Sequence, residues 1–519
     1  MQSQIHYHLK HLKQDIPAGL VVFLIALPLC LGVALASGAP LFSGIIAGIV
    51  GGLVVAWASG SHLSVSGPAA GLTVIVFNAI DSLGSFGAFL LSVFIAGIFQ
   101  MILGFLKAGL IGAFFPVAVI KGMLAAIGLI LIIKQVPHAT GYDTSFEGDE
   151  SYMQETAGTS FTEILDSLNL LSPGATLISV VALLILILWE TQVFKRLSLV
   201  QLVPAPLIAV LWGTLFNLWA GVNAPELAVS AKHLVSLPEL GTLGNFAAQL
   251  RLPDFSYWSD PAIYKVAGTI AIIASIETLL SLEAVDKLDP HKRVAPTNRE
   301  LKAQGLGNMI SGLAGGLPIT AVIVRSAANV NAGGQTRVSA FVHGLFLLFS
   351  VVFIAPYLNM IPLACLAAIL LQTGYKLAKP ALFKELYRKG WNQFLPFLIT
   401  IVAILATDLL LGIAIGMVVG IVFVLRSNFH QALTLTQSGN HFLLRLHKDV
   451  SFLNKAVLRG HLAKIEPNSE LVIDGTRALF IDQDILETIA DFLAAAQDRN
   501  INVETQGFSV ENISASSGH

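Results

Sequence analysis

Apolar runs long enough to cross a lipid bilayer recur along almost the whole chain, and this feature limits the possible folds most. A spanning helix needs about 20 mainly apolar residues. The 519 residues are 55% hydrophobic and only 12% charged, whereas soluble proteins carry roughly 25% charged residues. A multidomain soluble enzyme is therefore excluded. The net charge of −2 also argues against a nucleic-acid partner, which would require clustered basic residues.

Eleven clear apolar segments and three weaker ones are candidates for membrane helices. The first follows a polar N-terminal stretch without a cleavage site, so we interpret it as a retained helix and not as a signal peptide. The weaker segments are short or broken by Gly and Pro. Together they predict an α-helical polytopic membrane protein of about fourteen segments. The clear segments cover 16–37, 43–58, 86–106, 109–134, 174–192, 201–221, 262–282, 338–355, 358–375, 392–409 and 411–426, and the weaker ones 68–80, 303–315 and 318–332.

Loop charges predict which side of the membrane each loop faces. Basic residues gather at Lys195 and Arg196 and in the stretches 287–302 and 376–389, whereas the long loop 136–171 is acidic. Cytoplasmic loops are enriched in Lys and Arg. We therefore expect both termini in the cytoplasm and the acidic loop outside.

The composition changes near residue 437, where a small cytoplasmic α/β domain is expected to begin. Strand-like alternation at 441–450, a short apolar strand at 470–474, helical spacing over 482–497 and a last strand at 501–504 support it. The predicted organisation is a cytoplasmic N-terminal segment 1–15, a transmembrane domain 16–430, the α/β domain 437–507 and a disordered tail 508–519.

Two of the weaker segments open on similar Gly-Pro motifs. Ser66-Gly67-Pro68 opens one and Gly315-Gly316-Leu317-Pro318 the other, and the two prolines are 250 positions apart. Pro28 and Glu277 are 249 apart, so one offset relates two pairs of features and indicates an internal duplication. A kink packed on neighbouring helices is the alternative for either motif alone. A matched pair favours two broken helices whose N-termini present free N–H groups to an anion at mid-membrane.

Two charged residues lie inside the predicted membrane segments. Glu277 stands in an apolar helix, where a charge costs at least ~2.5–3.5 kcal/mol, and Ser281 is one turn further on the same face. Arg325 follows the second broken start and cannot lose its proton. These residues predict an anion site, with a structural Glu277–Arg325 salt bridge as the alternative. Asp408, followed by Gly412 and Gly416, is better explained by close helix packing.

These motifs belong to a longer ordered set that spans most of the chain. The set comprises Ala26-Leu27-Pro28 through Ala34-Leu35-Ala36-Ser37-Gly38, Ser66-Gly67-Pro68, Glu277-Thr278-Leu279-Leu280-Ser281, Arg299-Glu300-Leu301 with Gln304-Gly305-Leu306-Gly307-Asn308, Gly315-Gly316-Leu317-Pro318-Ile319-Thr320 with Arg325, and Thr407-Asp408 with Gly412 and Gly416. It resembles the SulP family, the sulfate-permease-like anion transporters whose animal relatives include prestin. The resemblance implies two inverted repeats of seven segments, with a core domain that moves against a gate domain.

The resemblance also implies where the substrate binds: between the third and tenth segments, flanked by the first and eighth. Glu277 matches an acidic position that is Asp in sodium-dependent bicarbonate members, and Ser281 replaces a Thr. With Thr320, they would hold the coupling ion, Na⁺ or H⁺. Val33 replaces an aromatic residue common in the first helix. The implied substrate-binding residues are Pro28, Leu29, Val33 and Ala34 on one wall, Pro68, Ala69, Ala70 and Gly71 with Ile319, Thr320 and Ala321 as the segments that supply backbone N–H groups, and Arg325 as the positive charge.

The tail resembles a STAS domain at Val472-Ile473-Asp474-Gly475-Thr476 and Phe480-Ile481-Asp482. The phosphorylatable serine of related anti-sigma-factor antagonists would fall near Asp484, so we expect no such switch here. As a whole, the sequence predicts a homodimeric transporter in a bacterial inner membrane that needs no cofactor beyond its coupling ion.

Several functions stay open beside the leading one. The leading prediction is a secondary active transporter of bicarbonate or sulfate. A carrier of dicarboxylates or nucleobases with the same architecture and an anion channel are the alternatives. An integral-membrane enzyme is disfavoured because the sequence has no HExxH, GxSxG or P-loop motif.

Overall fold

The computed structural model describes residues 2–110, 116–141, 171–191, 203–407, 409–429 and 432–508. The predictions made for Lys195 and Arg196, for most of the acidic loop, for Asp408 and for the tail beyond residue 508 lie outside these ranges. The chain divides into two compact units, one of Met1–Glu385 with Thr400–Ile413 and one of Leu386–Ile399 with Ala414–His519.

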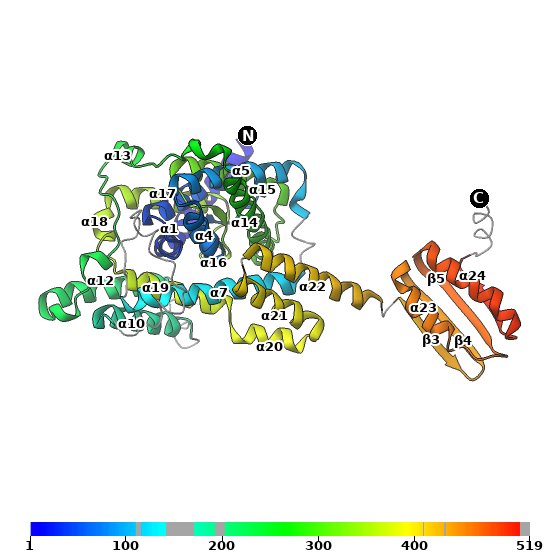
Figure 1. Cartoon of the computed structure of the whole chain (residues 1–519). Helices are drawn as coiled ribbons and strands as arrows, with labels where there is room; N and C mark the ends of the chain where they lie inside the picture. The colour runs from blue at the N-terminus through cyan, green and yellow to red at the C-terminus, as the bar shows by residue number, and fades with distance from the viewer. Residues whose placement is uncertain are drawn as a thin grey trace. The chain divides into compact units, whose positions relative to one another are not determined.

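In the part of the chain that the structure describes, helices cover most of the predicted membrane segments (Figure 1). Within the described ranges, six helical stretches are long and apolar enough to cross a membrane, and several shorter apolar helices accompany them. The polytopic α-helical prediction is therefore confirmed. The helices are α1 (Gln2–Ala36), α2 (Leu41–Val50), which continues through a π-helical turn into α3 (Ala56–Ala58), α4 (Thr73–Leu83), α5 (Phe86–Phe105), α7 (Val117–Thr140), α10 (Pro173–Trp189), α12 (Ala205–Asn223), α13 (Leu243–Ala248), α14 (Pro261–Leu288), α15 (Thr297–Ala314), α16 (Ile323–Asn331), α17 (Val338–Phe353), α18 (Ala355–Leu358), α19 (Leu363–Leu377), α20 (Pro380–Arg388), α21 (Trp391–Ala406) and α22 (Leu409–Phe429).

The first Gly-Pro motif forms a short strand, which pairs with a second strand directly after the other motif. Strand β1 (Ser66–Pro68) runs antiparallel to β2 (Ile319–Ala321), with Gly67 opposite Thr320. The sequence predicted helix from residue 68 and from residue 318, but each helix begins a few residues later. Proline disfavours the α conformation in the residue before it, here Gly67 and Leu317, so neither helix begins ahead of its proline. Helices α4 and α16 therefore start directly beyond the strand pair.

Glycines allow the helices behind the strand pair to pack very closely. A Cβ placed on Gly97 of α5 would lie 2.5 Å from the backbone nitrogen of Met309 on α15, and one on Gly305 would lie 2.7 Å from the carbonyl oxygen of Gly97. Neither position has room for a side chain. Small residues let helix backbones approach in this way, so α15 is locked against α5.

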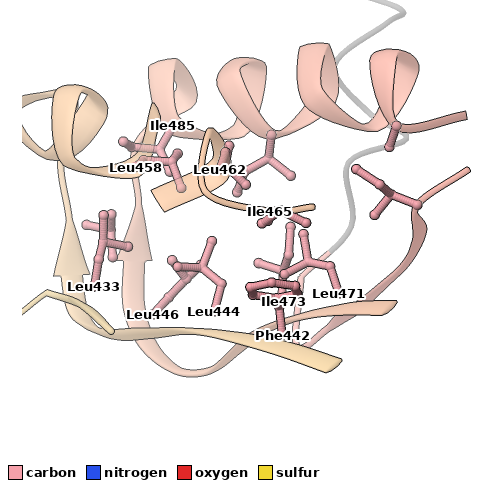
Figure 2. Close-up of a cluster of buried hydrophobic side chains, with 14 of the residues drawn as sticks. Leu433, Phe442, Leu444, Leu446, Leu458, Leu462, Ile465, Leu471, Ile473 and Ile485 are labelled. Carbon is pink, nitrogen blue, oxygen red and sulfur yellow. The ribbon is translucent and has the colours of Figure 1, made fainter. Parts of the chain in front are cut away.

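The C-terminal region folds into a four-stranded sheet with two helices. The sheet order is β3-β4-β5-β6, with β3 and β4 antiparallel and the other pairs parallel. Strand β3 begins before the predicted boundary at 437, and β5 runs to Ile481, well past the predicted end. Buried residues such as Leu444, Ile473 and Ile485 fill the space between sheet and helices (Figure 2). The elements are β3 (Leu433–Ser438), β4 (His441–Val450), α23 (Lys455–Leu462), β5 (Glu470–Ile481), α24 (Gln483–Asp498) and β6 (Asn502–Gln506).

Candidate functional site

The predicted site residues come together where the strand pair meets two long helices, α1 and α14. Helix α1 contacts β1, α4 and α16, and helix α14 contacts β2, α4 and α16. The strand pair fixes the starts of α4 and α16 beside each other. Four elements from the two predicted halves thus surround the region in which the sequence placed an anion.

Arg325 is almost completely buried, with 1% of its surface exposed. Its Nη2 donates a hydrogen bond of 3.3 Å to the carbonyl oxygen of Pro68. Nε and Nη1 have no hydrogen-bond partner among the described residues. The guanidinium lies against Gly67, where an added Cβ would be 2.2 Å from Nη1, and the thiol of Cys30 on α1 is another neighbour. The positive charge is therefore held at β1, and no carboxylate among the described residues forms an ion pair with it.

Glu277 lies on α14 and faces the start of the other broken helix. A Cβ on Gly71 would lie 2.5 Å from its Oε1, and the backbone N–H of Gly71 donates to the carboxylate. Its Oε2 is buried and has no partner within the described ranges. No ion pair joins Glu277 to Arg325 in this part of the chain, so the described structure does not contain the salt bridge that was the structural alternative. Ser281, one turn further along α14, is buried.

The backbone N–H groups of β2 already have protein partners. The N–H of Ile319 donates to Asn308 Oδ1 at 2.5 Å, and that of Ala321 donates to Thr278 Oγ1 at 3.2 Å. Thr320 pairs with Gly67 across the strands, and its hydroxyl lies 3.3 Å from the carbonyl oxygen of Ala321. The donors of β2 therefore hold the strand in place.

The predicted wall on α1 is densely packed. Val33 and Ala34 are buried, as is Pro28, while Leu29 is half-buried. Ser37 closes the end of this wall with a hydrogen bond of 2.6 Å from its hydroxyl to the carbonyl oxygen of Val33.

The start of the first broken helix is equally enclosed. Ala69 is buried, and the half-buried Ala70 packs against a cluster of Ala36, Leu131 and Leu370. The structure thus brings the α1 wall, both broken starts, Glu277 and Arg325 into one region.

Sequence reasoning missed three contacts of this region: Cys30 beside Arg325, Thr278 bonded to Ala321, and Asn308 bonded to Ile319. Asn308 and Gln304 stand four residues apart in the low-hydropathy segment 303–315. Such spacing on one helix face is a signal that could have drawn attention to them. In the described ranges, no group of three His, Cys, Asp or Glu side chains is arranged to hold a metal ion.

Comparisons with known proteins identify the family. The sequence model of the sulfate permease family matches residues 12–425. The putative sulfate transporter YvdB of Bacillus subtilis is 27% identical over 446 residues, which cover 86% of this chain and 79% of the relative. The bicarbonate transporter BicA of Picosynechococcus is 28% identical over 429 residues, which cover 81% of this chain and 71% of the relative.

Solved structures show the same fold. The transmembrane domain of a cyanobacterial bicarbonate transporter BicA matches with a TM-score of 0.65 at 24% identity, over 80% of this chain and 98% of that one. SLC26A9 matches with a TM-score of 0.75 at 17% identity, over 98% of this chain and 86% of that one. Because the family model spans most of its length, the chain belongs to the sulfate permease family.

Proposed function

We propose that the protein is a secondary active transporter of a small inorganic anion, with bicarbonate and sulfate as the leading substrates, and that it works by alternating access. Membership of the sulfate permease family makes it an anion transporter and not an enzyme. The substrate proposal draws on relatives that are named as a putative sulfate transporter and as a bicarbonate transporter.

The observation that carries the proposal is the buried guanidinium of Arg325 with two unpartnered nitrogens. Arginine keeps its proton at every accessible pH, and a buried charge without a partner is costly. A small oxyanion that accepts hydrogen bonds from Nε and Nη1 would supply the missing counter-charge. The nearby start of α16 adds its positive dipole end.

Coupling is proposed to run through Glu277, with Na⁺ or H⁺ as the coupling ion. Its carboxylate has one buried oxygen without a partner. A proton would neutralise that oxygen, and a sodium ion would use it as a ligand together with the hydroxyls of Ser281 and Thr320. Either ion offsets the charge of the arriving anion and lowers the cost of carrying both across the membrane.

The same proposal includes location and assembly. The polytopic chain is placed in a bacterial inner membrane with both termini in the cytoplasm, because the basic stretches 287–302 and 376–389 then face inward. We propose a homodimer that uses no cofactor other than the coupling ion. The domain boundaries at 16–430 and 437–507 belong to this proposal, although strand β3 already begins at Leu433.

Uptake by proteoliposomes tests the proposal. The purified protein should accumulate labelled bicarbonate or sulfate when a Na⁺ or H⁺ gradient is imposed, and excess unlabelled anion should saturate the uptake. Inhibition by uracil would favour a nucleobase carrier, and inhibition by succinate would favour a dicarboxylate carrier. A flux that shows no saturation would indicate an anion channel. Arg325→Ala should remove anion binding while the protein stays monodisperse. Unchanged binding by this variant would show that Arg325 is structural.

A further inference from the structure

We infer that Gln304 and Asn308 on α15 are positioning residues that hold the two broken helix starts in register, and that Glu300 fixes the orientation of Gln304. The inference rests on the proposed anion site, because it concerns the residues that place this site. None of the three side chains was among the residues expected to bind the substrate or the coupling ion.

One face of α15 carries a continuous polar stripe, which we define as Glu300, Gln304, Asn308 and Ser311. All four side chains are fully buried. Residues spaced by three and four lie on the same face of a helix. Buried polar groups are retained only when hydrogen bonds compensate their lost hydration, so the partners of the stripe reveal what it does.

The first half of the stripe holds β1. The amide Nε2 of Gln304 donates to Ser66 Oγ at 2.7 Å and to Glu300 Oε1 at 2.9 Å. The other carboxylate oxygen of Glu300 accepts a hydrogen bond from the hydroxyl of Ser59, just beyond α3. A chain of hydrogen bonds thus runs from the end of α3 through α15 to the first residue of β1.

Glu300 dictates which way the amide of Gln304 points. A carboxylate accepts hydrogen bonds, so it turns the NH₂ group of Gln304 toward itself. The same group then serves Ser66, and Oε1 of Gln304 has no partner among the described residues. A buried acceptor without a hydrogen bond destabilises the fold. This destabilisation is accepted because Glu300 holds the amide of Gln304 in this orientation.

The second half of the stripe holds β2. Asn308 accepts from the N–H of Ile319 at 2.5 Å and donates to its carbonyl oxygen at 3.0 Å, so its amide binds both backbone groups of one strand residue. Nδ2 of Asn308 also donates to Gln100 at 2.6 Å, and Gln100 donates to Ser275 at 3.3 Å. Ser275 is on α14, two positions before Glu277, so this branch reaches the coupling helix as well.

The strand pair needs such support because it is too short to be stable alone. It contains three residues on each side, and isolated two-stranded pairs are marginally stable even when they are longer. Helix α15, in contrast, is fixed against α5 by the glycine contacts at Gly97 and Gly305. The stripe therefore transfers the rigidity of the α5–α15 pair to both halves of the site.

Hydrogen–deuterium exchange on the full-length protein without substrate tests the inference independently of transport. Gln304→Met should raise exchange several-fold in peptides over residues 64–72 and to a smaller extent in peptides over 317–324, where the N–H of Val322 donates to Val65. Asn308→Leu should do the reverse. Ser66→Ala is a milder variant that removes the hydrogen bond between Ser66 and Gln304 but keeps the one to Glu300, and it should reproduce the exchange pattern of Gln304→Met. Ser92→Ala is the matched control, because in the described part of the chain this buried hydroxyl donates to the carbonyl oxygen of Ala88 on its own helix and to no residue of the strands.

Anion affinity gives the second readout. Loss of one buried hydrogen bond of ordinary strength corresponds to roughly a tenfold change in an equilibrium constant, so Gln304→Met should weaken binding of bicarbonate or sulfate about tenfold. Combining it with Ser66→Ala should add little, since the two changes break the same bond.

Two outcomes would overturn the inference: uniform exchange along the chain in these variants, or parental exchange at both strands. If the exchange pattern appears but the parent protein takes up neither anion, the positioning role stands and the proposed function fails.

Discussion

Replacing Gly67 by alanine tests whether the missing side chain at this position sets the place of the Arg325 charge. Gly67 lies in strand β1, where alanine adopts the same backbone, so the effect is steric. The new Cβ would lie 2.2 Å from Nη1 and 3.3 Å from Cζ of Arg325. Ordinary contacts between heavy atoms are about 3.5 Å or longer, so the guanidinium must move by roughly 1 Å.

That movement breaks the hydrogen bond between Arg325 and Pro68 and shifts the positive charge away from its position at β1. The hydrogen bond to Pro68 is already 3.3 Å long and is not expected to survive. Hydrogen bonds to charged groups contribute about 1.5–3 kcal/mol, so the loss of one such bond to the anion would weaken its binding roughly 10- to 150-fold. The dissociation constant for bicarbonate or sulfate, measured by titration of the purified protein, reports this change.

Gly268→Ala is the matched control. Gly268 lies on α14, and among the described residues no atom beyond its own stretch of helix backbone is within 4 Å of the position that its Cβ would occupy. It should bind the anion as the parent does and be equally or slightly more stable, because alanine favours helix by up to about 1 kcal/mol. Equal affinity in Gly67→Ala and Gly268→Ala would refute the argument that the bare backbone at Gly67 places the guanidinium.

Three further predictions concern coupling, the C-terminal sheet and pH. Glu277→Gln should still exchange anions but fail to accumulate them against a gradient; accumulation at the parental rate with the same ion dependence would contradict the coupling role. Deleting residues 433–519 should leave uptake measurable, since the Arg325 and Glu277 contacts lie in the first unit; a monodisperse truncation with no uptake would show that the sheet completes the transporter. Hydrogen bonds from the hydroxyl and N–H of Thr476, and the nearby Arg445, hold the pKa of Asp474 below its usual value. Their stabilisation is therefore complete above about pH 4 and is lost as the pH falls through the lowered pKa. The difference in melting temperature between the parent and Asp474→Asn should shrink on acidification, and a difference independent of pH would contradict this assignment.

The sequence predicted the region of the site well because its signals are local and repeated. Gly-Pro motifs at 66–68 and 315–318 mark breaks in apolar segments, and their common offset pairs them. Glu277 and Arg325 stand out as charges in apolar surroundings. Each of these features is visible within a few residues of the chain.

The partners of these residues were not predictable in the same way. Glu277 turns toward Gly71 and Arg325 toward Pro68, and no local pattern distinguishes this arrangement from a direct salt bridge. Which backbone donors remain free also depends on distant side chains, such as Asn308 at Ile319. The packing of whole helices decides which partners these residues bond to, because many pairings are compatible with the same local sequence pattern.

The pairing of β1 with β2 has a consequence for the synthesis of the protein in the membrane. Arg325 and the carbonyl group it bonds to are 257 positions apart, so the ribosome has released β1 long before its partner exists. Helix α4, with 11 residues, is too short to cross the hydrocarbon layer, which takes about 20. Until the second half arrives, the peptide groups of β1 have no strand to pair with, and in lipid each unpaired group is costly. We therefore expect that the peptide groups of β1 stay hydrated or bound to a chaperone until the second half is inserted. Pairing with β2 then satisfies their hydrogen bonds.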